Sequence, residues 1–282
     1  MCELSDVAGQ RRRAWINWEK RVSFQDRTVW ITGASSGIGA ALAVGFAAAG
    51  AHAVLSGRNE AALADVAAQC RGARTLAFDT TDLAALPGIV SAAGPVDILV
   101  NNAGISQRSL ALDTTFDVYR TVMEVDFFAP LRLTQLVLPA MVAARAGAIV
   151  NIASVAGKIG SPLRTGYCAA KHAMIGWSDA LRAEIAQYGV AVHVVTPGFV
   201  RTNVAVNAVQ GDGSTRGRSD PDIEAGVSPE AAAATILAGI AARTREIRVG
   251  DGPEMALVDL RGSDPDRLFD TMAGFAPVVA RP

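Results

Sequence analysis

Tyr167 and Lys171 have side chains whose chemistry and spacing together suggest catalysis. They stand four positions apart in a helical pattern, so both project from one face of the helix. A carbonyl that receives a hydride also needs a proton. A phenol beside an ammonium can supply one, because the positive charge stabilises the phenolate that remains. An isolated pair with this spacing is more often an ordinary amphipathic pair, so the catalytic interpretation depends on the neighbouring motifs.

Ser154 follows an apolar run at 148–153 that predicts a buried strand. Open α/β sheets bind their ligands at the carboxyl ends of the strands, which is where this hydroxyl is expected to lie. The order of the residues along the chain therefore places Ser154 and Tyr167 at one candidate site.

A glycine-rich turn runs from Thr32 to Gly39, with the spacing GxxxGxG, between a predicted strand and a predicted helix. Residues without a Cβ let the backbone turn sharply and approach a pyrophosphate, which then lies on the helix N-terminus. No P-loop lysine is present, which disfavours ATP or GTP chemistry. The strand before the turn and the helix after it favour a dinucleotide site over a merely structural turn.

The elements that must position these residues alternate between β-branched runs and alanine-rich segments. Near-continuous apolar strands predict a parallel sheet covered by helices on both faces, and right-handed crossovers make it an α/β doubly wound sheet. The predicted strands are 29–32, 52–56, 74–78, 97–101, 148–153, 190–196 and 246–249, and the predicted helices are about 37–49, 59–71, 115–144, 165–188 and 229–242.

The alternation predicts a single domain over residues 28–282. Two segments do not follow it. Residues 1–27 form an N-terminal extension with Trp15, Trp18 and Val22 at helical spacing among basic residues. We expect a helix docked on the domain or on a partner subunit, with weak contact to a membrane surface as the alternative. Residues 203–228 are rich in Gly, Ser, Asp and Asn, which predicts a mobile substrate loop.

Composition excludes several classes of protein. Of the 282 residues, 50% are hydrophobic, which argues against a disordered protein. The chain has 26 Lys+Arg and 27 Asp+Glu, and this balance argues against nucleic acid as the main partner. The uncharged stretch 28–57 is punctuated by glycines, so we predict no transmembrane span. Cys2, Cys70 and Cys168 have no metal-ligand spacing, and they predict free thiols, no metal site and a cytoplasmic protein.

The glycine-rich turn, the tetrapeptide 101–104 (NNAG), Ser154 and the pair Tyr167 and Lys171 occur in this order. Together they resemble the short-chain dehydrogenase/reductase family, over roughly residues 26–250. The resemblance implies a single-domain Rossmann fold with a seven-stranded sheet. We also expect the protein to form a homodimer or homotetramer. It makes Ser154 the hydroxyl that binds the substrate oxygen, Tyr167 the acid, and Lys171 the residue that also holds the nicotinamide ribose.

The same resemblance implies NADP(H) as the cofactor. An acid after the second strand selects NAD in such sites, but here Gly57 takes its place and Arg58 follows, and a guanidinium can bind a 2′-phosphate. Asp79 matches the position that contacts the adenine, although it could equally cap the following turn. The implied cofactor site comprises Gly33, Ser35, Ser36, Gly37, Ile38, Gly39, Arg58, Asp79, Asn102, Ala103, Gly104, Tyr167, Lys171, Pro197, Gly198, Val200 and Thr202.

Asp126 departs from the family pattern. Family members usually carry Asn after this Val on the central helix, where it orders a water that links the lysine to solvent. An ionised carboxylate cannot donate a hydrogen bond as an amide does. We therefore include Asp126 in the catalytic group, with a neutral replacement of similar size as the alternative.

The segment 158–166, together with Asn207, 211–214 and 228–230, resembles the branch that contains acyl- or alkyl-dihydroxyacetone-phosphate reductase. This predicts reduction of a hydrophobic or lipid-like ketone to a secondary alcohol. The first rival hypothesis is an NADP-binding regulatory protein with little turnover, which Asp126 motivates and the intact Ser154, Tyr167 and Lys171 oppose. The second is a sugar epimerase or dehydratase of the extended family, which the glycine spacing and the lack of a separate substrate domain disfavour.

Overall fold

The computed structural model describes residues 23–277, and the predicted positions Trp15, Trp18 and Val22 lie outside them. The strands are β1 (Thr28–Thr32), β2 (His52–Ser56), β3 (Arg74–Thr75), β4 (Ile98–Asn101), β5 (Gly147–Ile152), β6 (Val190–Pro197) and β7 (Glu246–Val249). The helices are α2 (Gly37–Ala48), α3 (Glu60–Ala67), α4 (Leu86–Ala93), α5 (Phe116–Met123), α6 (Ala129–Ala144), α7 (Thr165–Ile185), α8 (Pro221–Ala225), α9 (Pro229–Ala241), α10 (Pro253–Ser263) and α11 (Pro265–Gly274).

All seven strands are parallel and pair in the order β3-β2-β1-β4-β5-β6-β7. The order reverses direction between β1 and β4, so their carboxyl ends border the crevice where doubly wound sheets bind ligands. The predicted seven-stranded Rossmann fold is confirmed.

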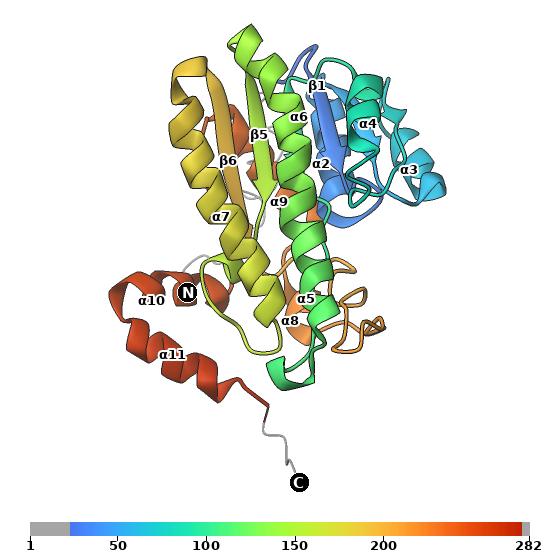
Figure 1. Cartoon of the computed structure of the whole chain (residues 1–282). Coiled ribbons are helices and arrows are strands. Elements are labelled where there is room, and N and C mark those ends of the chain that lie inside the picture. Colours follow the sequence, from blue (N-terminus) through green and yellow to red (C-terminus); the bar gives the residue numbers. More distant parts are fainter. Residues whose placement is uncertain (1–22, 278–282) are drawn as a thin grey trace, which may run out of the picture.

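Alternate strand residues face two separate hydrophobic layers, as expected for a sheet covered on both faces. Val29 and Ile31 point into the layer with α2, α3 and α9, whereas Trp30 points into the layer with α4, α6 and α7. Figure 1 shows α6 and α7 in front of β5 and β6, with α2 and α9 behind the sheet. These two layers fix the strand ends, and the strand ends in turn carry the candidate site.

The predicted strand 74–78 is too long, because only Arg74–Thr75 form β3. The chain continues beside β2 through hydrogen bonds from the N–H groups of Leu76 and Phe78 to Leu55 and Gly57. β3 lies at the edge of the sheet and pairs on one side alone, so its regular geometry ends early.

The predicted helix 115–144 contains a π-helical turn, Glu124–Phe128, between α5 and α6. Such turns often occur at functional sites, and this one contains Asp126. Helices α4, α8, α10 and α11 were not among the predicted elements. Helix α8 lies within the predicted loop 203–228. In the same loop, Val209 forms β-bridges with Gln107 and with Thr215, so much of the loop has defined structure.

The stretch Phe116–Ala144 is long and apolar enough to span a membrane by length and composition alone. The core helix of a globular domain passes the same test. In this structure Leu133, Val137 and Met141 of α6 belong to the layer that packs on the sheet. Packing on the sheet accounts for the apolar character of these three positions, and 33% of the most apolar window of the stretch is buried.

Candidate active site

The N-terminal turns of α7 carry Tyr167 and Lys171, four positions apart on this 21-residue helix. The Lys171 ammonium lies 5.6 Å from the centroid of the Tyr167 ring, so the predicted pair is brought together. Buried Gln107 fixes the start of the helix, because its Oε1 accepts hydrogen bonds from the N–H groups of Gly166 (2.7 Å) and Tyr167 (3.4 Å). Sequence reasoning missed Gln107.

Ser154 lies two positions after the end of β5 and caps a short 3₁₀ helix, η3 (Val155–Gly157). Its Oγ accepts a hydrogen bond from the N–H of Ala156 at 3.1 Å, which leaves the hydroxyl proton available to an acceptor. The helix η3 packs closely on α7, since a Cβ on Gly157 would lie 2.7 Å from the carbonyl oxygen of Lys171. The close packing holds the end of β5 beside the helix that carries Tyr167.

Lys171 and Asp126 form a buried ion pair. Nζ of Lys171 lies 3.3 Å from Oδ2 of Asp126, and the two side chains are 6% and 0% exposed. The ammonium also donates to the carbonyl of Ile152 at 3.1 Å, and Oδ1 of Asp126 accepts the N–H of Ile105 at 2.8 Å. The Asp126 carboxylate therefore points directly at the ammonium. Gly104 leaves room for the pair, because a Cβ there would lie 3.2 Å from Oδ1.

The two groups of this pair have raised pKa values. Burial raises the pKa of Asp126 more than the neighbouring Lys171 and the Ile105 N–H lower it. Burial opposes the charge on Lys171, but the attraction of Asp126 and Tyr167 outweighs it and raises the pKa of Lys171. The ammonium is thus held in its charged form beside the phenol.

The glycine-rich turn between β1 and α2 has the shape of an anion cradle. Gly33 and Gly37 have φ values of 63° and 55°, a region that favours glycine. A Cβ on Gly33 would lie 2.8 Å from the backbone of Ala103, and one on Gly37 would lie 3.0 Å from Thr202. The Ser36 side chain does not cap α2, and the first turn of α2 has no acidic residue. The free N–H groups and the positive end of the helix suit a pyrophosphate.

Asn102 and Ala103, which follow β4, hold this turn in place. The Asn102 amide donates to the carbonyls of Thr32 (3.0 Å) and Gly33 (3.1 Å), and the N–H groups of Asn102 and Ala103 donate to Oγ1 of Thr32. Thr32 therefore joins β1 to β4 at the point where the sheet order reverses. Sequence analysis placed Thr32 in the motif but assigned it no role.

Arg58 and Asp79 lie near one another beyond the ends of β2 and β3. The closest atoms, Nη1 of Arg58 and Oδ2 of Asp79, are 3.8 Å apart, and the Arg58 side chain is 76% exposed. Asp79 also caps a turn, because it accepts hydrogen bonds from the N–H and the hydroxyl of Thr81, and the N–H contact lowers the pKa of Asp79 most. The guanidinium is exposed, so another anion can reach it.

The segment Pro197–Thr202 leaves the end of β6 and reaches the glycine turn. The N–H of Gly198 donates to the carbonyl of Val249 at 2.9 Å, and the backbone of buried Val200 bridges to Val227. Thr202 lies against Gly37. The structure thus brings the predicted segments 33–39, 102–104 and 197–202 together, through the contacts of Gly33 with Ala103 and of Gly37 with Thr202.

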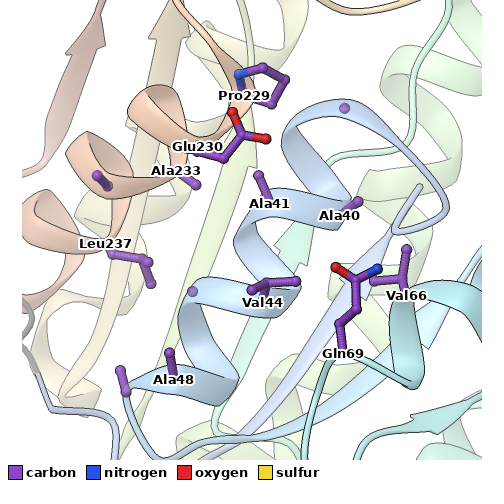
Figure 2. A pocket seen from close by; sticks show the side chains of 14 residues that line it. Ala40, Ala41, Val44, Ala48, Val66, Gln69, Pro229, Glu230, Ala233 and Leu237 are labelled. Carbon is purple, nitrogen blue, oxygen red and sulfur yellow. The ribbon is translucent and has the colours of Figure 1, made fainter.

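A groove of about 470 Å³ lies outside this arrangement, between α2 and α9. Figure 2 shows Ala40, Ala41 and Val44 of α2 facing this groove, with Ala233 and Leu237 on α9. Its lining includes Gly37 but none of Ser154, Tyr167, Lys171 and Asp126. The groove is therefore distinct from the candidate catalytic residues.

Comparisons with known proteins agree with this geometry. A family model described as short chain dehydrogenase matches residues 27–213. The chain is 40% identical over 276 residues to "Dehydrogenase/reductase SDR family member 7B" of Bos taurus, covering 93% of this chain and 85% of that protein.

Two solved structures share the fold. One is a short chain dehydrogenase/reductase from Burkholderia phymatum in complex with NAD, with a TM-score of 0.77, 24% identity and coverage of 92% of this chain and 99% of that one. The other is a short chain dehydrogenase from Burkholderia cenocepacia J2315 in complex with NADP, with a TM-score of 0.77, 23% identity and coverage of 90% and 100%. From the family match and the curated relative, this chain belongs to the short-chain dehydrogenase/reductase family of oxidoreductases.

Proposed function

We propose that this protein interconverts a carbonyl and a secondary alcohol with NADP(H), and that it reduces a hydrophobic or lipid-like ketone. The observation that carries the proposal is the Tyr167 ring beside the buried Lys171 ammonium on α7, against which the short helix capped by Ser154 packs. A phenol, a nearby cation and a free hydroxyl at the carboxyl edge of a dinucleotide-binding sheet suit carbonyl reduction.

In the proposed mechanism, Ser154 donates a hydrogen bond to the carbonyl oxygen and orients it toward Tyr167. When bound, NADPH supplies the hydride. Tyr167 then gives its proton to the developing alkoxide, while the ammonium of Lys171 stabilises the phenolate that forms. Asp126 tunes this step, because its carboxylate lies 3.3 Å from that ammonium and offsets part of its charge.

The cofactor preference follows from the end of β2. Gly57 brings no carboxylate toward the ribose, and the exposed Arg58 guanidinium can bind a 2′-phosphate in place of its contact with Asp79. Asp79 would lie near the adenine, and the segment Pro197–Thr202 would hold the nicotinamide. Solved relatives of this fold contain either NAD or NADP, so the preference rests on this chain's own residues.

The proposed substrate class is supported by apolar side chains beside the segment 203–228. Leu112 and Phe116 are 79% and 72% exposed, and Thr115, which directly precedes Phe116, donates its N–H to the carbonyl of Gly211. In the proposal, these two side chains contact the hydrophobic part of the substrate. The resemblance to acyl- or alkyl-dihydroxyacetone-phosphate reductases points to the same class.

The proposal is tested by following NADPH oxidation with ketones of increasing alkyl chain length and with matched short ketones. Turnover that rises with chain length is the expected result. Tight NADPH binding without oxidation by any ketone in the series would favour the regulatory alternative instead.

A further inference from the structure

Glu254, the second residue of α10, has its carboxylate buried against the segment that follows β6. The residue is 5% exposed, and its Oε1 accepts a hydrogen bond from the N–H of Phe199 at 3.0 Å. Its Oε2 is buried without a hydrogen-bond partner among the described residues. Glu254 also lies beyond residues 27–213, the part that the family model matches.

Two glycines make room for this carboxylate. A Cβ on Gly198 would collide with Oε1 of Glu254, and a Cβ on Gly252 would collide with Oε2. Burying a carboxylate that has a single hydrogen-bond donor is costly, and an apolar side chain would fill the same space at less cost. Simple packing therefore does not explain an acid here, whereas the Phe199 N–H requires an acceptor.

The hydrogen bond between Glu254 and Phe199 joins α10 to the segment Pro197–Thr202, which also contacts β7 and the glycine-rich turn. Gly198 is hydrogen-bonded to Val249 at the end of β7, and Thr202, three residues after Phe199, lies against Gly37 of the glycine turn. A shift of the Phe199 backbone would therefore change the position of Thr202 relative to the proposed dinucleotide site.

We infer that Glu254 is a positioning residue, which holds the segment Pro197–Thr202 in the shape that receives the nicotinamide end of the cofactor. This inference rests on the proposed function, because it assumes that the segment binds nicotinamide. Glu254 acts through the backbone of Phe199 and touches no reacting atom.

The test compares Glu254→Ala, Glu254→Gln and a matched control, Glu230→Ala. Glu230 is likewise the second residue of a helix, α9, which also begins with a proline, but its side chain is exposed. Glu230→Ala therefore controls for the loss of a negative charge at a helix N-terminus. Glu254→Gln keeps an acceptor oxygen of similar size and should restore the contact.

Two measurements separate positioning from general damage. The first is the dissociation constant of NADP⁺ compared with that of 2′-phospho-ADP-ribose, which lacks the nicotinamide. Glu254→Ala should weaken NADP⁺ about tenfold, as expected for a lost hydrogen bond to a charged group, and leave the fragment unchanged. The second is amide hydrogen exchange of residues 198–202 without ligand, which Glu254→Ala should accelerate while Glu254→Gln and Glu230→Ala do not.

Equal weakening of NADP⁺ and the fragment, or unchanged exchange at 198–202 in Glu254→Ala, would overturn the inference. If the parent protein binds neither ligand, the proposed function fails. In that case, faster exchange in Glu254→Ala would still show that Glu254 orders the segment, but the assignment of the segment to nicotinamide would be wrong.

Discussion

Nζ of Lys171 lies 3.3 Å from Oδ2 of Asp126, and both side chains are buried beneath Gly104. The family pattern has an amide at this position, which cannot form an ion pair. In this protein the cation beside the candidate acid, Tyr167, therefore has its own counter-charge. The electrostatic field at the Tyr167 phenol then depends on the protonation state of Asp126.

Asp126→Asn should retain or raise turnover at neutral pH and shift the pH–rate profile toward lower pH. Without the carboxylate, the positive charge of Lys171 is no longer offset, so it stabilises the phenolate left by proton transfer more strongly. The pKa of Lys171 should also fall, because burial is no longer outweighed by Asp126. Turnover at saturating NADPH across the pH range compares the two proteins. A large loss of activity at every pH would mean that the carboxylate has a catalytic role of its own.

Arg58→Ala should weaken NADPH binding about tenfold and leave NADH binding nearly unchanged, because in the proposed site the guanidinium binds the 2′-phosphate, which NADH lacks. Titration of both cofactors measures the two dissociation constants. Arg71→Ala serves as the control, since it removes an exposed arginine that precedes β3, at the other end of the strand from Asp79. Equal losses for NADPH and NADH would contradict the assignment of Arg58.

Asp220→Asn should loosen the segment 203–228. Asp220 accepts hydrogen bonds from Nε and Nη2 of Arg108, pairs with Arg216 at 2.6 Å, and lies 3.6 Å from Arg164, which precedes Tyr167 by three positions. Loss of the carboxylate charge leaves these guanidinium groups under-neutralised, which should cost about 1–3 kcal/mol of stability. Faster amide exchange in 203–228 is expected, with Asp222→Asn, an exposed neighbour, as the control.

The lowered pKa of Asp220 also predicts how the free energy of unfolding changes with pH. Burial opposes ionisation of Asp220, but the hydrogen bonds from Arg216 and Arg108 outweigh it and lower the pKa of Asp220 to about 2. A carboxyl whose folded pKa is lowered stabilises the fold above its unfolded pKa, and that contribution is lost as the pH falls from about 4 to about 2. Unfolding free energies of Asp220→Asn should lack this part of the acid dependence. An identical acid dependence in both proteins would contradict the role of Asp220.

Features that depend on neighbouring residues, such as strands, helix faces and tight turns, could mostly be predicted from the sequence. Apolar runs located the seven strands, and the spacing of Tyr167 and Lys171 placed them on one helix because helical periodicity is a short-range property. The glycine spacing likewise indicated a tight turn, and Gly33 and Gly37 adopt left-handed backbone angles there.

Contacts between distant parts of the chain were not predictable in this way. Gln107 and Gly166 are 59 positions apart, Glu254 and Phe199 are 55 apart, and Arg108 and Asp220 are 112 apart. Each contact depends on how loops after different strands pack, which no local pattern encodes. The family position drew attention to Asp126, but only the packing of the π-helical turn against α7 shows that its carboxylate points at Lys171.

The central claim is that Tyr167 supplies the proton in an NADPH-dependent carbonyl reduction, and Tyr167→Phe tests it most directly. The variant removes one hydroxyl and should leave the fold and the dissociation constant of NADPH nearly unchanged. Single-turnover oxidation of bound NADPH by a saturating hydrophobic ketone should slow by about 100- to 10,000-fold, the range for loss of a positioned acid. A rate close to that of the parent protein, with NADPH bound equally well, would contradict the account.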